Sequence, residues 1–448
     1  MTVNNSNIQV AEFDIFLSDL NGQLRGKRLP ATSLDKIMTE GFKMPRSVVG
    51  VDYWGDDVIE NGLVFETGDS DGICVPIKNT LAPVTWEDAP RQQVISMMTN
   101  PDGSPFTADP RQCLQVICEK FKALGLTPVV ATELEFYLFD IASIQAKQPM
   151  MSPWMPQGYA FERNDVYSIG ELDDFKHILS EIREACDAQG VPADTVIAEM
   201  GTGQFELNLN HEADALSAAD HAVMFKRIVK GVAKKHGHLA SFMAKPAGDK
   251  SGNGFHVHFS LLDESGKNIF DSGTAEGTDV LRHAIAGLIE CMRASMLIFA
   301  PHANSYRRFT PGAHAPIVAN WGYENRTVAV RVPESPNVAR RIEHRVAGAD
   351  ANPYLVLAAV LGAALHGITN KLEAPEETVG DTYASELPHQ SLPTEWPDAI
   401  RAFDGSELIK NVLSDQLVEV FTAVKLQEFA KFKARVTDAE YETYLGTL

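Results

Sequence analysis

The amino-acid sequence predicts an α+β protein with a small strand-rich N-terminal domain, residues 1–105, and a large α/β domain, residues 106–448. Three observations support this prediction. The chain has 448 residues, which is more than a single hydrophobic core usually serves. The first hundred residues contain short strand-like runs, whereas strands alternate with amphipathic helices from about residue 112 onward. A segment rich in turn-forming residues, 100–111, separates the two regions.

The N-terminal region begins with a predicted hairpin. Segment 13–30 contains two strand-like runs joined by Asn21 and Gly22, the dipeptide that a two-residue type I′ turn favours. The stretches RSVVGVDYWG and GICVPI predict two more short strands.

The second region alternates between the two kinds of element. Helical periodicity covers 112–124, 170–190 and 217–237, and strand-like runs cover 128–139 and the residues around Glu206. The apolar stretch that begins at Tyr354 follows an N-cap residue and a first-turn proline, so we expect a buried helix there. That stretch is too short to span a bilayer.

Composition narrows the class of protein. A formal net charge of −21 argues against nucleic acid or an anionic membrane as a partner. The five cysteines are an odd number and form no CxxC pair, which predicts reduced thiols and a cytoplasmic location. The first ten residues lack the basic and apolar regions of a signal peptide, so none is expected.

Two carboxylates interrupt the apolar run VVATELEFYLFD at residues 129–140. Glu133 and Glu135 are two residues apart, so on a strand they share one face. Two like charges this close are costly unless a cation, an arginine cluster or a shared proton lies between them.

Three further segments repeat this pattern of polar side chains among apolar neighbours. They contribute Glu199 and Glu206, His256 and His258, and Glu343 and Arg345. Burying the polar side chains of four such segments is costly unless they serve one common site. A site with mostly carboxylates and few imidazoles suits Mg²⁺ or Mn²⁺ better than zinc.

Arginines gather in the segment that follows. They are Arg307, Arg308, Arg326, Arg331, Arg340, Arg341 and Arg345. Arginine forks beside an acidic metal site suit a phosphate-bearing ligand. The sequence contains neither a P-loop nor a Gly-x-Gly-x-x-Gly motif, so a nucleotide would be bound by metal ions and arginines.

The motifs ELEFYLFD, GTGQFELNLN, GNGFHVHFSL, NSYRRFTPG, NRTVAVRVP and RRIEHRVAGADANPYL follow one another in this order. With them the chain resembles the glutamine synthetase family over nearly its whole length, in particular its γ-glutamylputrescine synthetases. The resemblance implies a β-grasp-like N-terminal domain and a catalytic domain with an open, curved antiparallel sheet. It also implies six-subunit rings, as a hexamer or dodecamer, with each active site completed by a neighbour's N-terminal domain.

The resemblance assigns roles to individual residues. One metal ion is assigned to Glu135, Glu199 and Glu206, and another to Glu133, His256 and Glu343, with two to three Mg²⁺ or Mn²⁺ ions per active site. The glutamate-binding positions are Gly252, Arg308, Arg326 and Arg345, and the ATP-binding positions are His258, Ser260, Arg326 and Arg331. Arg308 and Arg326 are catalytic positions, because they also face the transferred phosphoryl group.

The chain departs from the glutamine-forming enzymes at two acidic positions. His314 stands where those enzymes have a lid glutamate, and MPRSVVGVD replaces an aspartate-bearing motif of the N-terminal domain. Both acids would help bind ammonium, so their loss suggests a site for an organic amine. His314 is either a base for that amine or a residue that only lines the lid.

The predicted function is therefore ATP-dependent ligation of L-glutamate to an amine through γ-glutamyl phosphate, with putrescine or another polyamine as the first choice. The alternatives are an alkyl or aromatic monoamine, and then ordinary glutamine synthesis. A member of a different class, a noncatalytic assembly or sensor protein, would not need the six metal-ligand positions that this chain retains. A metal-dependent hydrolase would leave the arginines unexplained.

Overall fold

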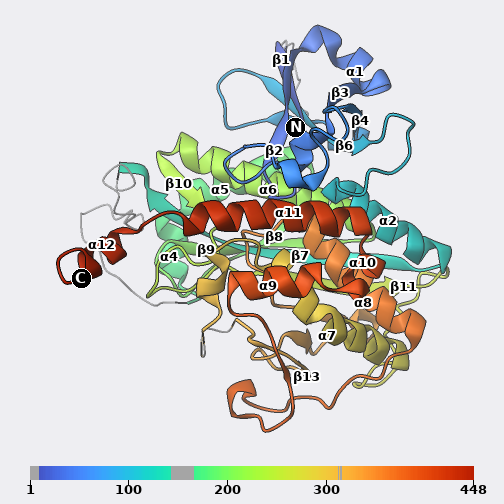
Figure 1. The fold of residues 1–448 in the computed structure, drawn as a ribbon. Helices are drawn as coiled ribbons and strands as arrows, with labels where there is room; N and C mark the ends of the chain where they lie inside the picture. The colour runs from blue at the N-terminus through green and yellow to red at the C-terminus, as the bar shows by residue number, and fades with distance from the viewer. Residues whose placement is uncertain (1–9, 143–165, 311, 313–314) are drawn as a thin grey trace.

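Two large β-sheets, one in each predicted region, organise the described part of the chain (Figure 1), and β12 Val318–Ala319 pairs with β16 Gln390–Ser391 in a small third sheet. The structure is a computed structural model, and it describes residues 10–142, 166–310, 312 and 315–448. The N-terminal sheet lies at one end of the molecule and the larger sheet lies within the helical body.

The N-terminal sheet has six strands in the order β2-β1-β6-β4-β3, with β5 paired to β6. Their bounds are β1 Glu12–Ser18, β2 Leu24–Pro30, β3 Phe42–Pro45, β4 Asp71–Pro76, β5 Ala82–Val84 and β6 Arg91–Thr99, and helix α1 spans Leu34–Glu40. Strand β1 pairs antiparallel with β2 and parallel with β6. The strand-rich character of this region is confirmed, and the proposed boundary at residue 105 falls between β6 and the first helix of the larger region.

Two local predictions in this region are wrong. The hairpin exists, but its loop spans residues 19–23, because the Asp19 carboxylate accepts the N–H groups of Asn21 and Gln23 at 2.9 and 2.8 Å. Asp19 thus stabilises a longer loop than a type I′ turn. The segment Arg46–Gly50 is a 3₁₀ helix and not a strand, with Val49 buried in the core and the Gly50 carbonyl accepting from Asn61 Nδ2 at 2.9 Å.

The larger sheet has eight strands in the order β13-β14-β15-β11-β7-β9-β8, with β10 paired to β7. Their bounds are β7 Thr127–Asp140, β8 Ala193–Ala198, β9 Gln204–Glu212, β10 His238–Ser241, β11 Phe255–Leu262, β13 Trp321–Tyr323, β14 Val330–Val332 and β15 Ile342–His344. Strands β13 and β14 pair in parallel. The other pairs of this sheet within the described ranges are antiparallel, which confirms the predicted antiparallel character.

Helices cover one face of this sheet and thereby leave the other face for a site. The helices are α2 Pro110–Ala123, α4 Ile169–Asp174, α5 Lys176–Gln189 and α6 Ala215–Lys235. Leu134 and Phe136 are fully buried, and the Phe136 ring packs edge-on against Phe225 of α6. Because side chains alternate along a strand, Glu133 and Glu135 project from the opposite face of β7.

The apolar stretch at Tyr354 forms helix α8, Pro353–Asn370, which packs against α7, Asp279–Phe299. The Asn352 side chain accepts the N–H of Tyr354, as the predicted N-cap requires. The helix is longer than the stretch suggested and is apolar enough to cross a membrane, but 78% of it is buried inside the protein. It is therefore a core helix.

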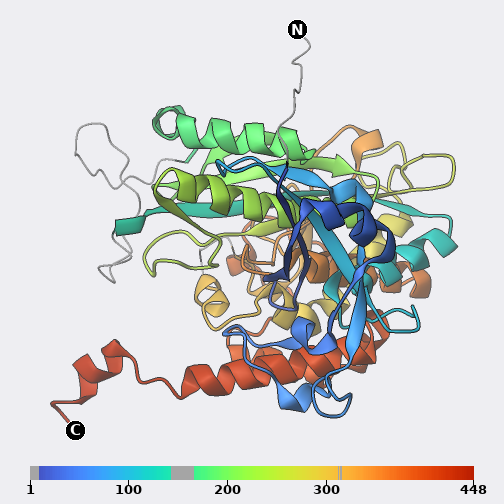
Figure 2. The same cartoon turned by 90° about the horizontal axis from the view of Figure 1, so that it is seen from above.

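The chain ends in four described helices, and one of them, α11, contacts the N-terminal region. They are α9 Trp396–Asp404, α10 Glu407–Val412, α11 Asp415–Lys433 and α12 Asp438–Tyr444. On α11, the buried Glu428 accepts from Lys425 Nζ at 2.8 Å and from Asn21 Nδ2 of the N-terminal hairpin at 2.7 Å. Helix α12 projects away from the body of the protein (Figures 1 and 2).

Candidate active site

Strand register brings the predicted ligand residues onto one face of the larger sheet. His256 of β11 lies opposite Glu133 of β7, and Glu135 lies opposite Glu206 of β9. His258 lies opposite Glu343 of β15 in the same way. Glu199 directly follows the end of β8. Antiparallel partners on one face have Cβ atoms about 5 Å apart, so the register alone gathers these side chains.

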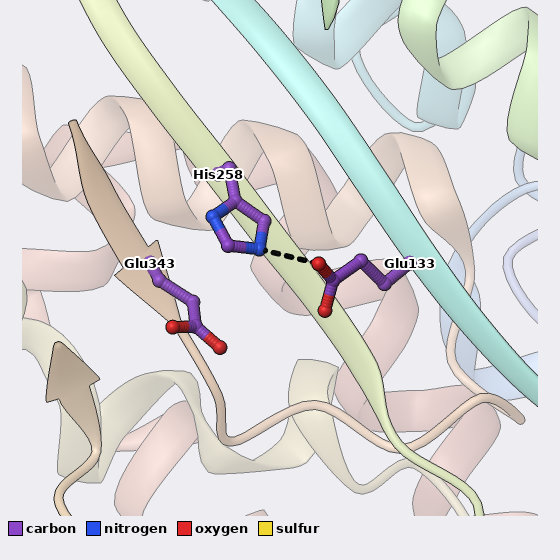
Figure 3. Close-up of side chains that lie close together, drawn as sticks. All are labelled: Glu133, His258 and Glu343. Carbon is purple, nitrogen blue, oxygen red and sulfur yellow. Dashed lines mark hydrogen bonds and ion pairs between the residues drawn. The ribbon is translucent and has the colours of Figure 1, made fainter. Parts of the chain in front are cut away.

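Glu133 lies at the centre of this group. Its Oε1 is 2.9 Å from His258 Nε2, and its Oε2 is 3.1 Å from His256 Nδ1. Figure 3 shows Glu133, His258 and Glu343 converging from three strands. Donor atoms of this triplet lie within 4.8 Å of one another, as do those of Glu133, Glu206 and His256. Neither triplet is identical to a predicted ligand set. One combines Glu206 with Glu133 and His256, and the other contains His258, which was predicted to contact ATP and not a metal ion.

Glu199 and Glu206, the carboxylates on the β8–β9 side, have too few positively charged groups nearby to offset their burial and mutual repulsion. Burial, reinforced by repulsion from Glu133 and Glu135, raises the pKa of Glu206 to about 10. Burial and the nearby Glu135 raise the pKa of Glu199 to about 7. At neutral pH the protein alone thus holds a proton on Glu206 and partly on Glu199.

Glu133 of β7 and Glu343 of β15, which lie beside the histidines of β11, are in the opposite situation. Burial works against ionisation of Glu133, but hydrogen bonds from His256 and His258 outweigh it and hold its pKa well below the usual range. For Glu343, burial is outweighed by Arg345 and the same two histidines, which lower its pKa to about 2. One site thus contains ionised and protonated carboxylates side by side.

This donor set fits divalent cations. Carboxylate oxygens with one or two imidazoles are typical ligands of Mg²⁺ and Mn²⁺. A bound dication would replace the protons that Glu199 and Glu206 otherwise hold, and would remove the repulsion among the four glutamates. The site therefore needs a cation to be fully ionised at neutral pH.

A pH dependence of metal binding follows from this arrangement. Mn²⁺ must displace protons from Glu199 and Glu206, so we expect roughly tenfold or greater tightening of binding between pH 6 and pH 8. Titration calorimetry in two buffers with different ionisation enthalpies should show about one or more protons released per site at pH 6.5. Glu199→Gln should reduce that number. Equal affinity at pH 6 and pH 8 would contradict the assignment.

Arginines lie along one side of the same cavity. Arg331 Nη1 donates to Glu343 Oε2 at 2.8 Å, and Arg345 donates to Oε1 of the same carboxylate. Arg331 also donates to Glu324 at 2.8 Å. The buried Arg308 donates to the Val346 carbonyl at 2.7 Å, and a Cβ on Gly252 would lie 2.9 Å from its Cγ. Gly252 therefore leaves room for the Arg308 side chain.

The predicted residues line a common cavity of about 440 Å³. Its lining includes Glu133, Glu135, Glu199, Glu206, Gly252, His256, His258, Arg308, Arg326, Arg331, Glu343 and Arg345. Ser260 lines a neighbouring cavity of about 560 Å³, which shares Glu133, Asn208, His258 and Arg341 with the first. His314 lies outside the described residues, so the prediction for it is untested.

Comparison with known proteins identifies the family. Residues 107–444 match the model of the glutamine synthetase catalytic domain. The chain is 40% identical over 436 residues to γ-glutamylputrescine synthetase PuuA of Escherichia coli, covering 96% of this chain and 91% of that protein. The chain belongs to the glutamine synthetase family. This confirms the resemblance inferred from the sequence.

Other known proteins are also similar to this chain, in sequence or in structure. A glutamate–isopropylamine ligase of Pseudomonas is 33% identical over 440 residues, covering 96% of this chain and 94% of that protein. A solved structure described as a GmaS/ADP complex superposes with a TM-score of 0.84 at 27% identity, covering 98% and 97% of the two chains. Enzymes of this family use ATP and divalent metal ions, which agrees with the donor set described above.

Several residues of the candidate active site were not predicted from the sequence. Gln204 is buried, with Nε2 at 3.0 Å from the Gly252 carbonyl and 3.3 Å from Glu135 Oε2. Asn208 Nδ2 donates to Glu133 at 3.3 Å. Arg341, which the sequence placed only in the arginine cluster, donates from Nε to His258 Nδ1 at 3.3 Å. Gln204 and Asn208 flank Glu206 at a spacing of two, so strand periodicity could have identified them.

Proposed function

We propose that this protein is an ATP-dependent ligase that joins the γ-carboxyl group of L-glutamate to an organic amine. The observation that carries the proposal is the shared cavity, in which a carboxylate–histidine cluster faces Arg308, Arg326 and Arg345. Similarity to a γ-glutamylputrescine synthetase and to a glutamate–isopropylamine ligase supports an amine as acceptor. Putrescine or a related polyamine is the first candidate, because the putrescine enzyme has the higher identity of the two.

Each group of residues has a proposed part in this reaction. Glu135, Glu199 and Glu206 would hold one divalent ion, and Glu133, His256 and Glu343 another, with Mg²⁺ or Mn²⁺ as the metal and two to three ions per site. The ions would neutralise charge on the phosphoryl group and on the γ-carboxylate of glutamate. His258 lies within hydrogen-bonding distance of Glu133 and would orient that ligand as well as contact ATP.

The arginines would bind the two negatively charged substrates. Gly252, Arg308, Arg326 and Arg345 would hold glutamate, and Arg308 and Arg326 would also face the phosphoryl group that moves from ATP to the γ-carboxylate. A carboxylate is a poor acylating group, whereas γ-glutamyl phosphate has a good leaving group and reacts with a free amine. Guanidinium groups already in position stabilise the charge that develops during the transfer.

The neighbouring cavity is the proposed site of the ATP base and sugar. It shares four lining residues with the cavity of the metal cluster, and Leu262 and Val338 give it apolar surface. Ser260 and Arg331 would contact ATP, the latter from the metal-cluster side. A base between apolar side chains with its phosphates on cations is a common arrangement for nucleotides.

The assembly and the location are further parts of the proposal. We infer a cytoplasmic homo-oligomer of six-subunit rings, as a hexamer or dodecamer, from the family membership and the free cysteines. Light scattering after size exclusion would give the mass of the particle. His314 as a base for the amine remains a hypothesis, and an unchanged pH profile of amine turnover in His314→Ala would contradict it.

The test of the function is phosphate release from ATP with Mg²⁺ and L-glutamate across a panel of amines. The panel contains ammonium, putrescine, spermidine, ethanolamine, isopropylamine and an aromatic amine. Strong stimulation by putrescine or spermidine, with little from ammonium, is the expected result. A preference for a monoamine would support the same mechanism, with a monoamine and not a polyamine as the substrate. No stimulation by any amine with Mg²⁺ or Mn²⁺ would favour the noncatalytic alternative.

A further inference from the structure

A second cavity lies outside the catalytic one, between the N-terminal hairpin loop, helix α6, strand β10 and helix α11. Its volume is about 800 Å³, and in the described part of the chain it shares no lining residue with the catalytic cavity. We call it the lysine cavity, after Lys226, Lys230 and Lys234, which line it from α6. These lysines are four residues apart, so they lie along one face of the helix. The cavity therefore has one positively charged wall.

The charge of this wall has few partners in the protein. Lys230, Lys234 and Arg435, which all line the cavity, form no ion pair with another described residue. Lys226 Nζ donates to two backbone carbonyls, at 2.8 and 3.3 Å. Burial, reinforced by the nearby Lys230, lowers the pKa of Lys226 to about 7. These observations together indicate positive charge that no adjacent carboxylate offsets.

The carboxylates that line the cavity do not supply the missing negative charge. They are Asp350 and Glu428. Glu428 already pairs with Lys425 Nζ at 2.8 Å, and Asp350 accepts from Ser305 Oγ at 2.6 Å. Burial raises the pKa of Asp350, although Ser305 and Lys226 oppose this effect. The lysine cavity thus keeps a surplus of positive charge in a protein with a net charge of −21.

Aromatic side chains form another part of the lining. Lys226 and Lys230 lie over the Phe242 ring, at 5.4 and 5.8 Å from its centre. Trp396 and Phe432 also line the cavity, and their rings pack edge-on at 6.4 Å. Trp396 is only 6% exposed, yet its indole N–H has no hydrogen-bond partner within the described residues. A buried donor without a partner is costly, so an acceptor atom of a ligand would be favourable there.

We propose that the lysine cavity is a second binding site, for a small organic anion with an aromatic or hydrocarbon body. The acidic group of the ligand contacts the lysines of α6, and its apolar body packs among Phe242, Trp396 and Phe432. An inorganic anion would leave the aromatic rings uncovered, and a neutral apolar molecule would leave the lysines without a counterion. The site is separate from the catalytic cavity, and the inference does not depend on the proposed function.

The test measures binding of phenylbutyrate to the full-length protein by titration calorimetry, with ADP, Mg²⁺ and L-glutamate present in excess to occupy the catalytic cavity. We expect one site per subunit with a Kd below about 1 mM. Phenylbutyramide lacks the charge and butyrate lacks the ring, so each should bind roughly tenfold more weakly. Lys230→Gln should weaken phenylbutyrate binding by about tenfold, because a charge-assisted contact is lost. The Lys230 side chain is exposed, so this variant should fold.

Lys235→Gln is the matched control. Lys235 lies on the same helix, but it pairs with Glu181 at 2.6 Å and does not line the cavity. Its variant should bind phenylbutyrate within about twofold of wild type. Trp396→Phe removes the unpaired N–H and should bind about fivefold more weakly.

Three results would overturn the proposal. They are no saturable binding of either phenylbutyrate or naphthalenesulfonate, equal affinity for the acid and its amide, and equal losses in Lys230→Gln and Lys235→Gln. Because the assay measures binding and not turnover, each of these results would leave the proposed catalytic function standing.

Discussion

Replacing Glu206 by glutamine is expected to reduce turnover severely and, at the same time, to stabilise the metal-free protein at pH 8. The loss of a metal ligand should lower kcat/KM by roughly a thousandfold, because several kcal/mol of charge stabilisation disappear. The gain in stability has a separate cause. Burial and the neighbouring glutamates raise the pKa of Glu206 to about 10 in the folded state, from an ordinary value of 4.5.

The sign of the pH effect follows from this shift. Above pH 4.5 the unfolded chain loses the Glu206 proton while the folded chain keeps it, so folding becomes less favourable as pH rises toward 10. Glutamine has no proton to lose and is free of this penalty. At pH 8 the metal-free variant should therefore exceed wild type in free energy of unfolding by up to about 5 kcal/mol, which is about 1.4 kcal/mol for each pH unit above 4.5, and at pH 4.5 by little.

Thermal unfolding in the presence of a chelator measures the effect. Glu212→Gln is the matched control on the same strand, because Glu212 does not line the cavity and should show no gain at pH 8. Adding Mn²⁺ should stabilise wild type more than Glu206→Gln. A variant that is less stable than wild type at pH 8 would show that Glu206 is not a strained carboxyl group.

Replacing Arg308 by lysine is expected to cost roughly a hundredfold in kcat/KM for glutamate, although the charge is kept. Arg308 is buried, and its Nη1 is already used by the Val346 carbonyl, so the remaining donors of the fork face the cavity. Lysine has a single flexible ammonium group and cannot serve both the carbonyl and a substrate.

Arg307 offers a control of the same residue type at the adjacent position. Its side chain is exposed and does not line the cavity, so Arg307→Lys should remain within about twofold of wild type. Steady-state assays with glutamate varied at saturating ATP would compare the two variants. Equal losses in both would indicate that the segment, and not the Arg308 fork, matters for glutamate.

The parts of the site that lie on strands could be predicted from the sequence. A spacing of two gives Glu133 and Glu135 one face, and the same periodicity applies to His256 and His258. The identity of the cross-strand partners could not be read in this way, because register depends on the packing of the whole sheet. The pairing of Glu133 with both histidines is therefore a result of the structure.

The parts that depend on irregular backbone were predicted poorly. Arg46–Gly50 has the β-branched residues of a strand, but tertiary packing of Val49 makes it a 3₁₀ helix. The lining of the catalytic cavity combines residues 166–167 with residues 197–200 through a backbone hydrogen bond, and no periodicity connects these segments. Long-range contacts of this kind need the three-dimensional structure.

The central claim is that the γ-carboxylate of glutamate is phosphorylated by ATP before an amine attacks it. The most direct measurement uses L-glutamate labelled with ¹⁸O in the γ-carboxyl group, together with ATP, Mg²⁺ and putrescine. Mass spectrometry should find one ¹⁸O atom in each phosphate released and an equal amount of γ-glutamylputrescine. Phosphate without ¹⁸O would mean that water attacks ATP, and would contradict the account.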